Sequence, residues 1–271
     1  MSDEEFRLLR VLIRDHCGVD YSADNRYLLE RRLTPRLLAL HMRSFTEYYL
    51  YLRYTADQRA ELDEIADRVT TNETYFFRER YQLDAFQKEI LSEILQTPRR
   101  PRRLHVWSAG CSTGEEAYTL AMMIHETGWF EGWDVRVLGT DVSRKVLAVA
   151  RRGVYGRSSM RVIDERYQRT YLAHLDGRFA VRADIKAMVH FAKMNLLDED
   201  SLAAVAEMDV IFCRNVLIYF DGASRKRAID VFQRKLVRRG YLLLGHSESL
   251  INVTTAFELV HLEHDMVYRK P

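Results

Sequence analysis

Apolar residues in the first part of the chain recur at the spacing of amphipathic helices. From residue 3 to about residue 70 they stand three or four positions apart, with no strand alternation between them. The breaks in this pattern suit helix caps and short turns, and they fall at Gly18, Thr34-Pro35, Ser44 and Thr55. The pattern predicts an all-helical N-terminal domain over residues 1–70.

The pattern changes after residue 103, where short apolar, β-rich runs begin to alternate with helical stretches. The expected strands are Leu104–Ala109, Val135–Thr140, Val189–Met194, Asp209–Cys213 and Tyr241–Gly245, and the expected helices are Glu115–Glu126, Ser143–Arg152 and Ala223–Arg238. Such alternation implies a parallel, doubly wound sheet. We therefore expect an α/β domain over residues 104–271, closed by a strand or hairpin near the C-terminus.

Two segments do not follow these patterns. Residues 71–103 read as a linker and a helix, and their end, Gln96–Arg103, is marked by prolines and arginines. Residues 155–188 interrupt the strand and helix alternation and are expected to form an insert. Within that insert, Arg178–Ile185 predicts a strand.

The composition narrows the class of protein. A hydrophobic content of 47% with 30% charged residues is ordinary for a soluble globular protein, and no apolar run approaches the ~18 residues of a membrane span. The start of the chain is acidic and lacks the order of a signal peptide. A net charge of +2 is far from the basic stripe of a dedicated nucleic-acid binder. We expect a cytoplasmic monomer with no nucleic-acid partner and no membrane insertion.

The cysteines indicate neither a disulfide framework nor a metal cluster. The three residues are far apart and never form a Cys-x-x-Cys pair: Cys17, Cys111 and Cys213. Free thiols in a reducing compartment fit this spacing better, and we expect no metal site.

The stretch Val106–Met122 carries the first candidate chemistry. It ends a strand at Gly110, turns to Gly114 and resumes as a helix. In doubly wound sheets ligands bind beyond the carboxyl ends of the strands, where this turn brings backbone close to them. No Lys-Ser/Thr pair follows Gly114, and the two glutamates at the helix start would repel a phosphate. A positively charged ligand is therefore favoured, although the glycine spacing alone also suits a structural tight turn.

Asp141 strengthens the case for a bound nucleoside. It ends the second expected strand, where an acidic side chain accepts hydrogen bonds from ribose hydroxyls. Alternatively it caps the next helix, although Ser143 serves that purpose as well. A glycine turn, glutamates near a cation, a ribose acid and no phosphate site together describe S-adenosylmethionine.

Two later strand ends complete a crevice. Asn195 follows its strand, and its amide either faces an adenine edge or is a turn residue. Asn215 ends the next strand, with Tyr219 about one turn further on. The stretch from Cys213 to Val216 lacks the Asn-Pro-Pro-Tyr turn of amine methyltransferases, which disfavours nitrogen methylation.

Six blocks, taken in order, resemble the signatures of the CheR-type chemotaxis receptor methyltransferases. They are Asn72–Glu79, Val106–Met122, Gly139–Gly156, Asn195–Leu197, Phe212–Asp221 and Gly245–Leu250. The resemblance implies a class I methyltransferase sheet with a small antiparallel β insert, S-adenosylmethionine as cofactor and S-adenosylhomocysteine as product. The residues that it implies in cofactor binding are Asn72, Thr74, Arg78, Gly110, Glu116, Asp141, Asn195, Leu196, Asn215 and Val216.

Within that set, the resemblance favours Glu116 over Glu115 for the methionyl amino group and places Arg78 near the methionyl carboxylate. One departure is visible, because methyltransferases usually have an acid where this chain has Ser108. The amino group must then find its anion elsewhere, and Glu116 supplies one. Phe76 and Phe77 are equally well explained as core anchors of the linker.

The resemblance implies methyl transfer to glutamate γ-carboxylates on the cytoplasmic helices of chemoreceptors. Arg78, Asn215 and Tyr219 are the polar groups expected around the reacting carboxylate. One rival is a methyltransferase for a small molecule or a nucleic acid, which the motif Asn72–Glu79 argues against. The other rival is a cofactor-binding module that docks on partner proteins without turnover.

Two further expectations concern receptor recognition. Residues 26–53 contain six arginines against two acids, which is either a solvated face or a surface that steers glutamate-rich receptor helices. In some CheR-type enzymes the insert grips a receptor's C-terminal peptide as an added strand. Here Arg169–Asp184 has a single glycine, Gly177, and is shorter than in those members. We therefore expect methylation without a peptide tether, unless the shortened turn still presents a usable edge.

Overall fold

The computed structural model describes residues 1–98 and 101–271; Arg99 and Arg100, within the predicted boundary Gln96–Arg103, lie outside the described residues. The N-terminal part is helical and packs around its own apolar core, in which Leu9, Leu33 and Tyr48 are fully buried. Its elements are α1 (Asp3–Cys17), the 3-10 turn η1 (Ala23–Asn25), α2 (Arg26–Ala39), α3 (Phe45–Tyr54) and α4 (Gln58–Val69).

Three of the four predicted breaks are helix ends, and local capping chemistry explains them. Gly18 ends α1 in the left-handed conformation, Ser44 caps α3 through the Glu47 N–H, and Thr55 ends α3. The break predicted at Thr34-Pro35 is wrong, because Pro35 lies inside α2. The proline sits on an exposed face, so the carbonyl that its missing N–H leaves without a helical partner is open to solvent.

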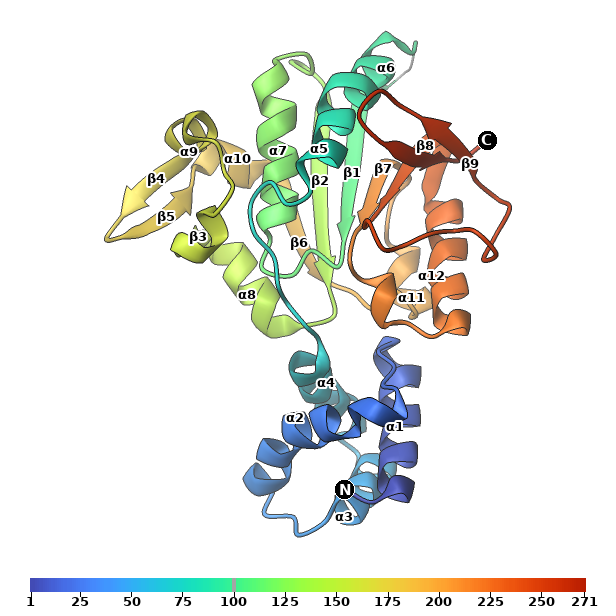
Figure 1. Ribbon diagram of the computed structural model, residues 1–271. Coiled ribbons are helices and arrows are strands. Elements are labelled where there is room, and N and C mark those ends of the chain that lie inside the picture. The colour runs from blue at the N-terminus through green and yellow to red at the C-terminus, as the bar shows by residue number, and fades with distance from the viewer. Residues whose placement is uncertain (99–100) are drawn as a thin grey trace.

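The second domain is built on a seven-stranded mixed sheet (Figure 1). Five strands are parallel and the last two are antiparallel, in the order β6 (Val189–Lys193), β2 (Asp134–Asp141), β1 (Arg103–Ala109), β7 (Met208–Cys213), β8 (Leu236–Leu244), β10 (Met266–Arg269) and β9 (Glu258–His261). The predicted α/β fold class and the closing hairpin are confirmed.

Two predicted boundaries are wrong. The strand expected over Arg178–Ile185 ends at Val181, because Ala183–Ala187 forms a short helix. Helix α12 (Gly222–Lys235) ends three residues before the predicted Arg238, and β8 begins at once instead of at Tyr241. Leu236 is fully buried and pairs with Met208 of β7, so packing against the neighbouring strand overrides the helical spacing of this short segment.

Helices cover both faces of the sheet. One face packs against α7 (Glu115–Thr127) and a continuous helical segment made of α5 (Arg80–Ala85), the π turn η2 (Phe86–Ile90) and α6 (Leu91–Gln96). The other face packs against α11 (Glu199–Ala203) and α12. Neighbouring residues of β7 point to opposite faces: Phe212 lies in the core between the sheet and α7, and Ile211 lies in the core between the sheet and α12.

The predicted insert forms a small antiparallel sheet beside the main one, in the strand order β3-β5-β4 (Figure 1). Its elements are β3 (Val154–Tyr155), the 3-10 turn η3 (Arg157–Met160), α9 (Glu165–Tyr171), β4 (Leu172–Leu175), β5 (Arg178–Val181) and α10 (Ala183–Ala187), and α8 (Arg144–Arg152) precedes it. Asp176 and Gly177 both have positive φ and join β4 to β5 by a two-residue turn.

The strand order places a crevice at the carboxyl ends of β1 and β7. Strand β1 pairs with β2 on one side and with β7 on the other, so the chain reverses its direction of winding at β1. The N-terminal helices lie at this end of the sheet (Figure 1). Asp63 of α4 fixes them there, because its buried carboxylate accepts hydrogen bonds from Arg144 (2.7 Å) and pairs with Lys193.

The glycine turn between β1 and α7 yields a stability prediction. Gly114 has φ +94°, and a Cβ there would lie 2.8 Å from the Cβ of Ala150. Gly114→Ala should therefore lose about 1–2 kcal/mol from the left-handed backbone and about 1–3 kcal/mol more from overpacking. Gly132→Ala is the control, because Gly132 has φ +75° and no atom within 4 Å. Equal losses in urea unfolding would show that the contact with Ala150 has no cost.

Candidate functional site

A pocket of about 1020 Å³, counting the solvent at its mouth, opens at the carboxyl ends of the parallel strands. The linker between α4 and α5 forms one wall, and turns after β1, β2, β6 and β7 form the others. The structure brings all of the predicted site residues to this one pocket: Asn72, Thr74, Arg78, Gly110, Glu116, Asp141, Asn195, Leu196, Asn215, Val216 and Tyr219.

The glycine turn is held against both neighbouring strands. The N–H groups of Gly110 and Cys111 donate to the Thr140 carbonyl at 2.8 Å each, which fixes the turn beside the end of β2. On the β7 side, a Cβ at Gly110 would lie 2.3 Å from Cγ2 of Val216. Only glycine allows the two turns to approach this closely.

Asp141 presents a desolvated carboxylate to the pocket. Its oxygens accept the N–H groups of Ser112 and Ser143, at 2.9 Å each. An ionised carboxylate has about four acceptor positions, so acceptor capacity remains for ligand hydroxyls. Burial raises the pKa of Asp141 to about 6, against the lowering effect of these hydrogen bonds. Ser143 caps α8 through the Val146 N–H, so the alternative in which Asp141 is the helix cap is wrong.

The two glutamates at the start of α7 face different surroundings. Glu115 turns toward the insert and accepts hydrogen bonds from Thr113 (2.6 Å) and Ser159 (2.8 Å). Glu116 lines the pocket and accepts one from Ser108 Oγ at 2.6 Å. Burial raises the pKa of both carboxyl groups. Of the two, only Glu116 is placed to meet a cationic group in the pocket.

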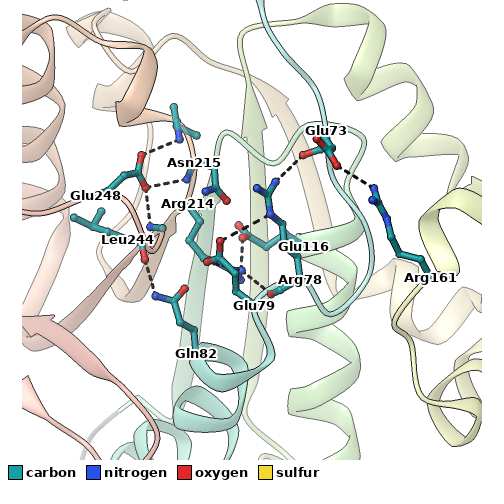
Figure 2. Close-up of polar contacts among 12 residues, drawn as sticks. Glu73, Arg78, Glu79, Gln82, Glu116, Arg161, Arg214, Asn215, Leu244 and Glu248 are labelled. Carbon is teal, nitrogen blue, oxygen red and sulfur yellow. Dashed lines mark hydrogen bonds and ion pairs between the residues drawn. The ribbon is translucent and has the colours of Figure 1, made fainter.

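The linker is anchored by its apolar side chains and presents its polar ones. Phe76 and Phe77 are buried core anchors, as one reading of the sequence had it. The Arg78 guanidinium lines the pocket and donates to the Glu73 carbonyl at 2.8 Å (Figure 2). Arg78 and Arg161 of the insert flank the Tyr75 ring, at 5.8 and 4.1 Å from its centroid.

Arg214 is a site residue that the sequence reasoning missed. Its side chain is 2% exposed, and it donates to the Arg78 carbonyl at 2.6 Å and to Glu79 at 3.2 Å (Figure 2). Its second terminal nitrogen, Nη1, lies 3.5 Å from Glu116. A signal was present in the sequence, because this arginine directly continues the buried run Met208–Cys213.

The residues after β6 and β7 are held by protein contacts. The Asn195 amide donates to the His16 carbonyl, and its oxygen accepts the Leu197 N–H at 3.0 Å. Both ends of this amide are thus engaged by the protein. Its hydrogen bond to the Leu197 N–H, two residues on, is that of a turn residue, which is the second of the two roles expected for Asn195. Asn215 has φ +58°, and its N–H donates to Glu248 at 2.9 Å.

The thiols near the pocket are unsuited to nucleophilic chemistry. Cys17 and Cys111 line the pocket, and Cys213 lies at the end of β7. All three are buried, and burial raises the pKa of Cys17 to about 11 and the pKa of Cys111 and Cys213 well above the usual thiol range.

No helix within residues 1–98 and 101–271 is long and apolar enough to cross a membrane.

The polar groups of the pocket match S-adenosylmethionine. Asp141 has acceptor positions left for ribose hydroxyls, Glu116 offers an anion for an ammonium group, and Arg78 offers a cation for a carboxylate. The α7 start carries two acids and no lysine, so it suits no phosphate. A doubly wound sheet with such a crevice at its switch point defines an S-adenosylmethionine-dependent methyltransferase.

The comparisons with known proteins agree. Residues 4–70 match the CheR methyltransferase all-alpha domain, and residues 72–266 match the CheR methyltransferase SAM-binding domain. The chain belongs to the CheR methyltransferase family.

Full-length relatives support this assignment. Chemotaxis protein methyltransferase 2 of Vibrio cholerae is 33% identical over 275 residues, covering 100% of this chain and 94% of that protein. The chemotaxis protein methyltransferase of Borreliella burgdorferi is 36% identical, with 92% and 88% covered. Chemotaxis protein methyltransferase 1 of Pseudomonas aeruginosa is 34% identical, with 99% and 98% covered.

The position of Asp141 predicts a loss of cofactor affinity on its removal. Asp141→Ala should weaken S-adenosylhomocysteine binding at least about tenfold, because hydrogen bonds to a charged acceptor contribute about 1.5–3 kcal/mol. Asp134→Ala is the control, since Asp134 is an exposed carboxylate at the other end of β2. Titration calorimetry measures both, and unchanged affinity in a folded Asp141→Ala protein would remove Asp141 from the site.

The pKa of about 6 for Asp141 predicts a pH dependence of binding. Hydroxyl groups donate best to the ionised carboxylate, so affinity for S-adenosylhomocysteine should fall as the pH is lowered through about 6. The raised pKa of Glu116 acts in the same direction. Asp141→Asn should show a shallower profile, measured by calorimetry from neutral to mildly acidic pH. A flat wild-type profile would contradict the prediction.

Proposed function

We propose that this protein transfers the methyl group of S-adenosylmethionine to glutamate γ-carboxylates on the cytoplasmic helices of chemoreceptors. The observation that carries the proposal is the chemical character of the pocket. Among the described residues that line it, there is no histidine or lysine, while the Arg78 and Arg214 guanidiniums are present. A nitrogen nucleophile would need a base to take its proton, and the pocket carboxylates of Glu116 and Asp141 are already assigned to groups of the cofactor. A carboxylate nucleophile needs no base.

The proposed reaction requires alignment more than proton transfer. S-adenosylmethionine supplies an electrophilic methyl group when bound. A glutamate side chain, with an ordinary pKa of about 4.3, is already ionised near neutral pH. The protein's task is to orient that carboxylate and to exclude water from it. Arg78, Asn215 and Tyr219 line the pocket and are the groups that we propose surround it.

Labelled S-adenosylmethionine and receptor cytoplasmic fragments test the reaction. We expect label on the fragments that mild base releases, because a glutamate methyl ester is base-labile. At a cofactor concentration below its dissociation constant, the Asp141→Ala protein should give less of this label. Base-stable label would indicate nitrogen methylation. Cofactor binding without any transfer would favour the rival reading, a module that docks without turnover.

We further propose that the helical domain recognises the receptor through part of the arginine-rich surface of residues 26–53. Not all six arginines of residues 26–53 are free to contact a receptor. Arg36 pairs with the buried carboxylate of Glu61 at 2.5 Å, and Arg32 bridges α2 to Val69 and Thr71, so both hold the domain together. Within the described residues, Arg31, Arg43 and Arg53 are exposed, and their guanidinium groups form no ion pair or hydrogen bond.

Reversal of these three exposed arginines to glutamate should therefore slow receptor methylation and weaken its salt dependence, because steering of an acidic helix is lost. Affinity for S-adenosylhomocysteine should stay unchanged. The control carries the same change of charge at exposed positions of the other domain: Arg136, Arg234 and Arg238. Equal methylation rates for the two variants at every salt concentration would contradict the steering role.

Independence from a receptor C-terminal peptide is also part of the proposal. The tight turn at Asp176–Gly177 makes β4 and β5 a minimal hairpin of four residues each, which leaves β4 a short outer edge. A hairpin of different length shifts strand register and with it the binding edge. Calorimetry against the C-terminal peptides of the host's receptors should show no binding, and micromolar affinity for any of them would overturn this expectation.

A further inference from the structure

Glu248, in the loop after β8, makes an unusual set of contacts beside the pocket. Its carboxylate accepts four backbone N–H groups, and Glu248 is not among the residues that line the pocket. Figure 2 shows it beside Asn215. Oε2 accepts from Asn215 at 2.9 Å and from Gly245 at 2.7 Å. Oε1 accepts from Val216 at 3.0 Å and from Ile218 at 3.2 Å. Three of these four donors belong to the turn after β7.

That turn supplies pocket residues in a conformation that needs support. Asn215 has φ +58°, a left-handed conformation that asparagine adopts more readily than most residues but that still costs more than it does for glycine. Asn215, Val216 and Tyr219 all line the pocket, and Val216 packs against the glycine turn at Gly110. A small displacement of this turn would therefore move one wall of the site.

The carboxylate is itself firmly placed. The Glu248 N–H donates to the Gly245 carbonyl at 2.8 Å, which closes the loop that carries it. Just before the loop, the buried Gln82 side chain donates to the Leu244 carbonyl at 2.7 Å (Figure 2). A Cβ at Gly245 would lie 2.8 Å from the Asn215 nitrogen, so the loop and the turn are in direct contact.

We infer that Glu248 is a positioning residue for the methyl-transfer site, one that holds the turn after β7 without touching the ligand. Four N–H donors need four acceptor positions, and an ionised carboxylate is the side-chain group that offers them. Glutamine in its place keeps one oxygen but turns an NH₂ toward two of the donors. The turn then loses two hydrogen bonds and faces a donor instead.

Glu248→Gln tests this role, and the chain offers a matched control. Glu89 of η2 also accepts two backbone N–H groups, from Glu263 at 2.7 Å and His264 at 3.2 Å, but it holds the β9–β10 hairpin and does not line the pocket. Both variants are compared with the wild type by calorimetry with S-adenosylhomocysteine, by turnover with receptor fragments, and by the backbone amide NMR signals of the turn.

We expect Glu248→Gln to weaken S-adenosylhomocysteine binding and to lower kcat, each about tenfold, and to shift the amide signals of Asn215, Val216 and Ile218. Glu89→Gln should leave all three measurements unchanged, even if it lowers the thermal midpoint. Equal effects of the two variants on affinity and kcat would overturn the inference, because general loss of stability would then explain them. Wild-type affinity and kcat in Glu248→Gln would overturn it as well.

A measurement on the wild-type protein keeps the inference testable should Glu248→Gln fail to fold. The amides of Asn215, Val216 and Ile218 should exchange slowly with deuterium although they lie in a turn, and exchange as fast as in an exposed loop would overturn the role of the carboxylate. The kcat readout rests on the proposed function. If the wild type transfers no methyl group to receptors, that proposal fails, while the calorimetry and the amide signals still decide the role of Glu248.

Discussion

The burial of the Arg214 guanidinium is the constraint around which the site is organised. A charge removed from water is costly unless it is paired and hydrogen-bonded, so a side chain that is 2% exposed must find its partners nearby. It finds them in the Arg78 carbonyl and Glu79 of the linker and in Glu116 at the start of α7. One buried cation thus joins the end of β7, the first helix after the glycine turn and the linker that lies over the crevice.

The raised pKa values of the acids in the pocket have the same cause, which is the low polarity of their surroundings. Burial raises the pKa of Asp141 and Glu116, which means that each carboxylate lacks part of the solvation it would have in water. A ligand that brings hydroxyl and ammonium donors restores that solvation, so the cost of desolvation in the free protein favours binding of such a ligand. This explains how a chain of net charge +2 binds a cationic cofactor through local charge alone.

Parts of the chain far apart in sequence converge on this crevice. The helical domain reaches it through Val19, which bridges to Phe220, and through the Asp63 carboxylate that pairs with Lys193 at the end of β6. The insert reaches it through Ser159, whose carbonyl accepts the Phe76 N–H at 3.0 Å and whose hydroxyl donates to Glu115. Movement of the helical domain or of the insert would therefore displace the linker or the turns that line the pocket.

The sequence by itself determined the kinds of elements, their order and the neighbourhood of the site. Periodicity separates helices from strands because their side-chain periods differ, and strand ends in a parallel sheet gather at one edge whatever the details of packing. Asp141, Asn195 and Asn215 could be placed near one another on that ground alone. The family motifs then indicated the linker, which periodicity could not connect to the crevice.

Tertiary structure decided which polar groups face the ligand and which hold the protein together. Arg32 and Arg36 looked like surface charges, but their partners come from α4 and the linker, which helical spacing within α2 cannot reveal. Likewise, nothing local to Glu248 shows that it accepts N–H groups about thirty residues away. Long-range pairing of polar groups depends on how the elements pack, and one-dimensional patterns carry no information about it.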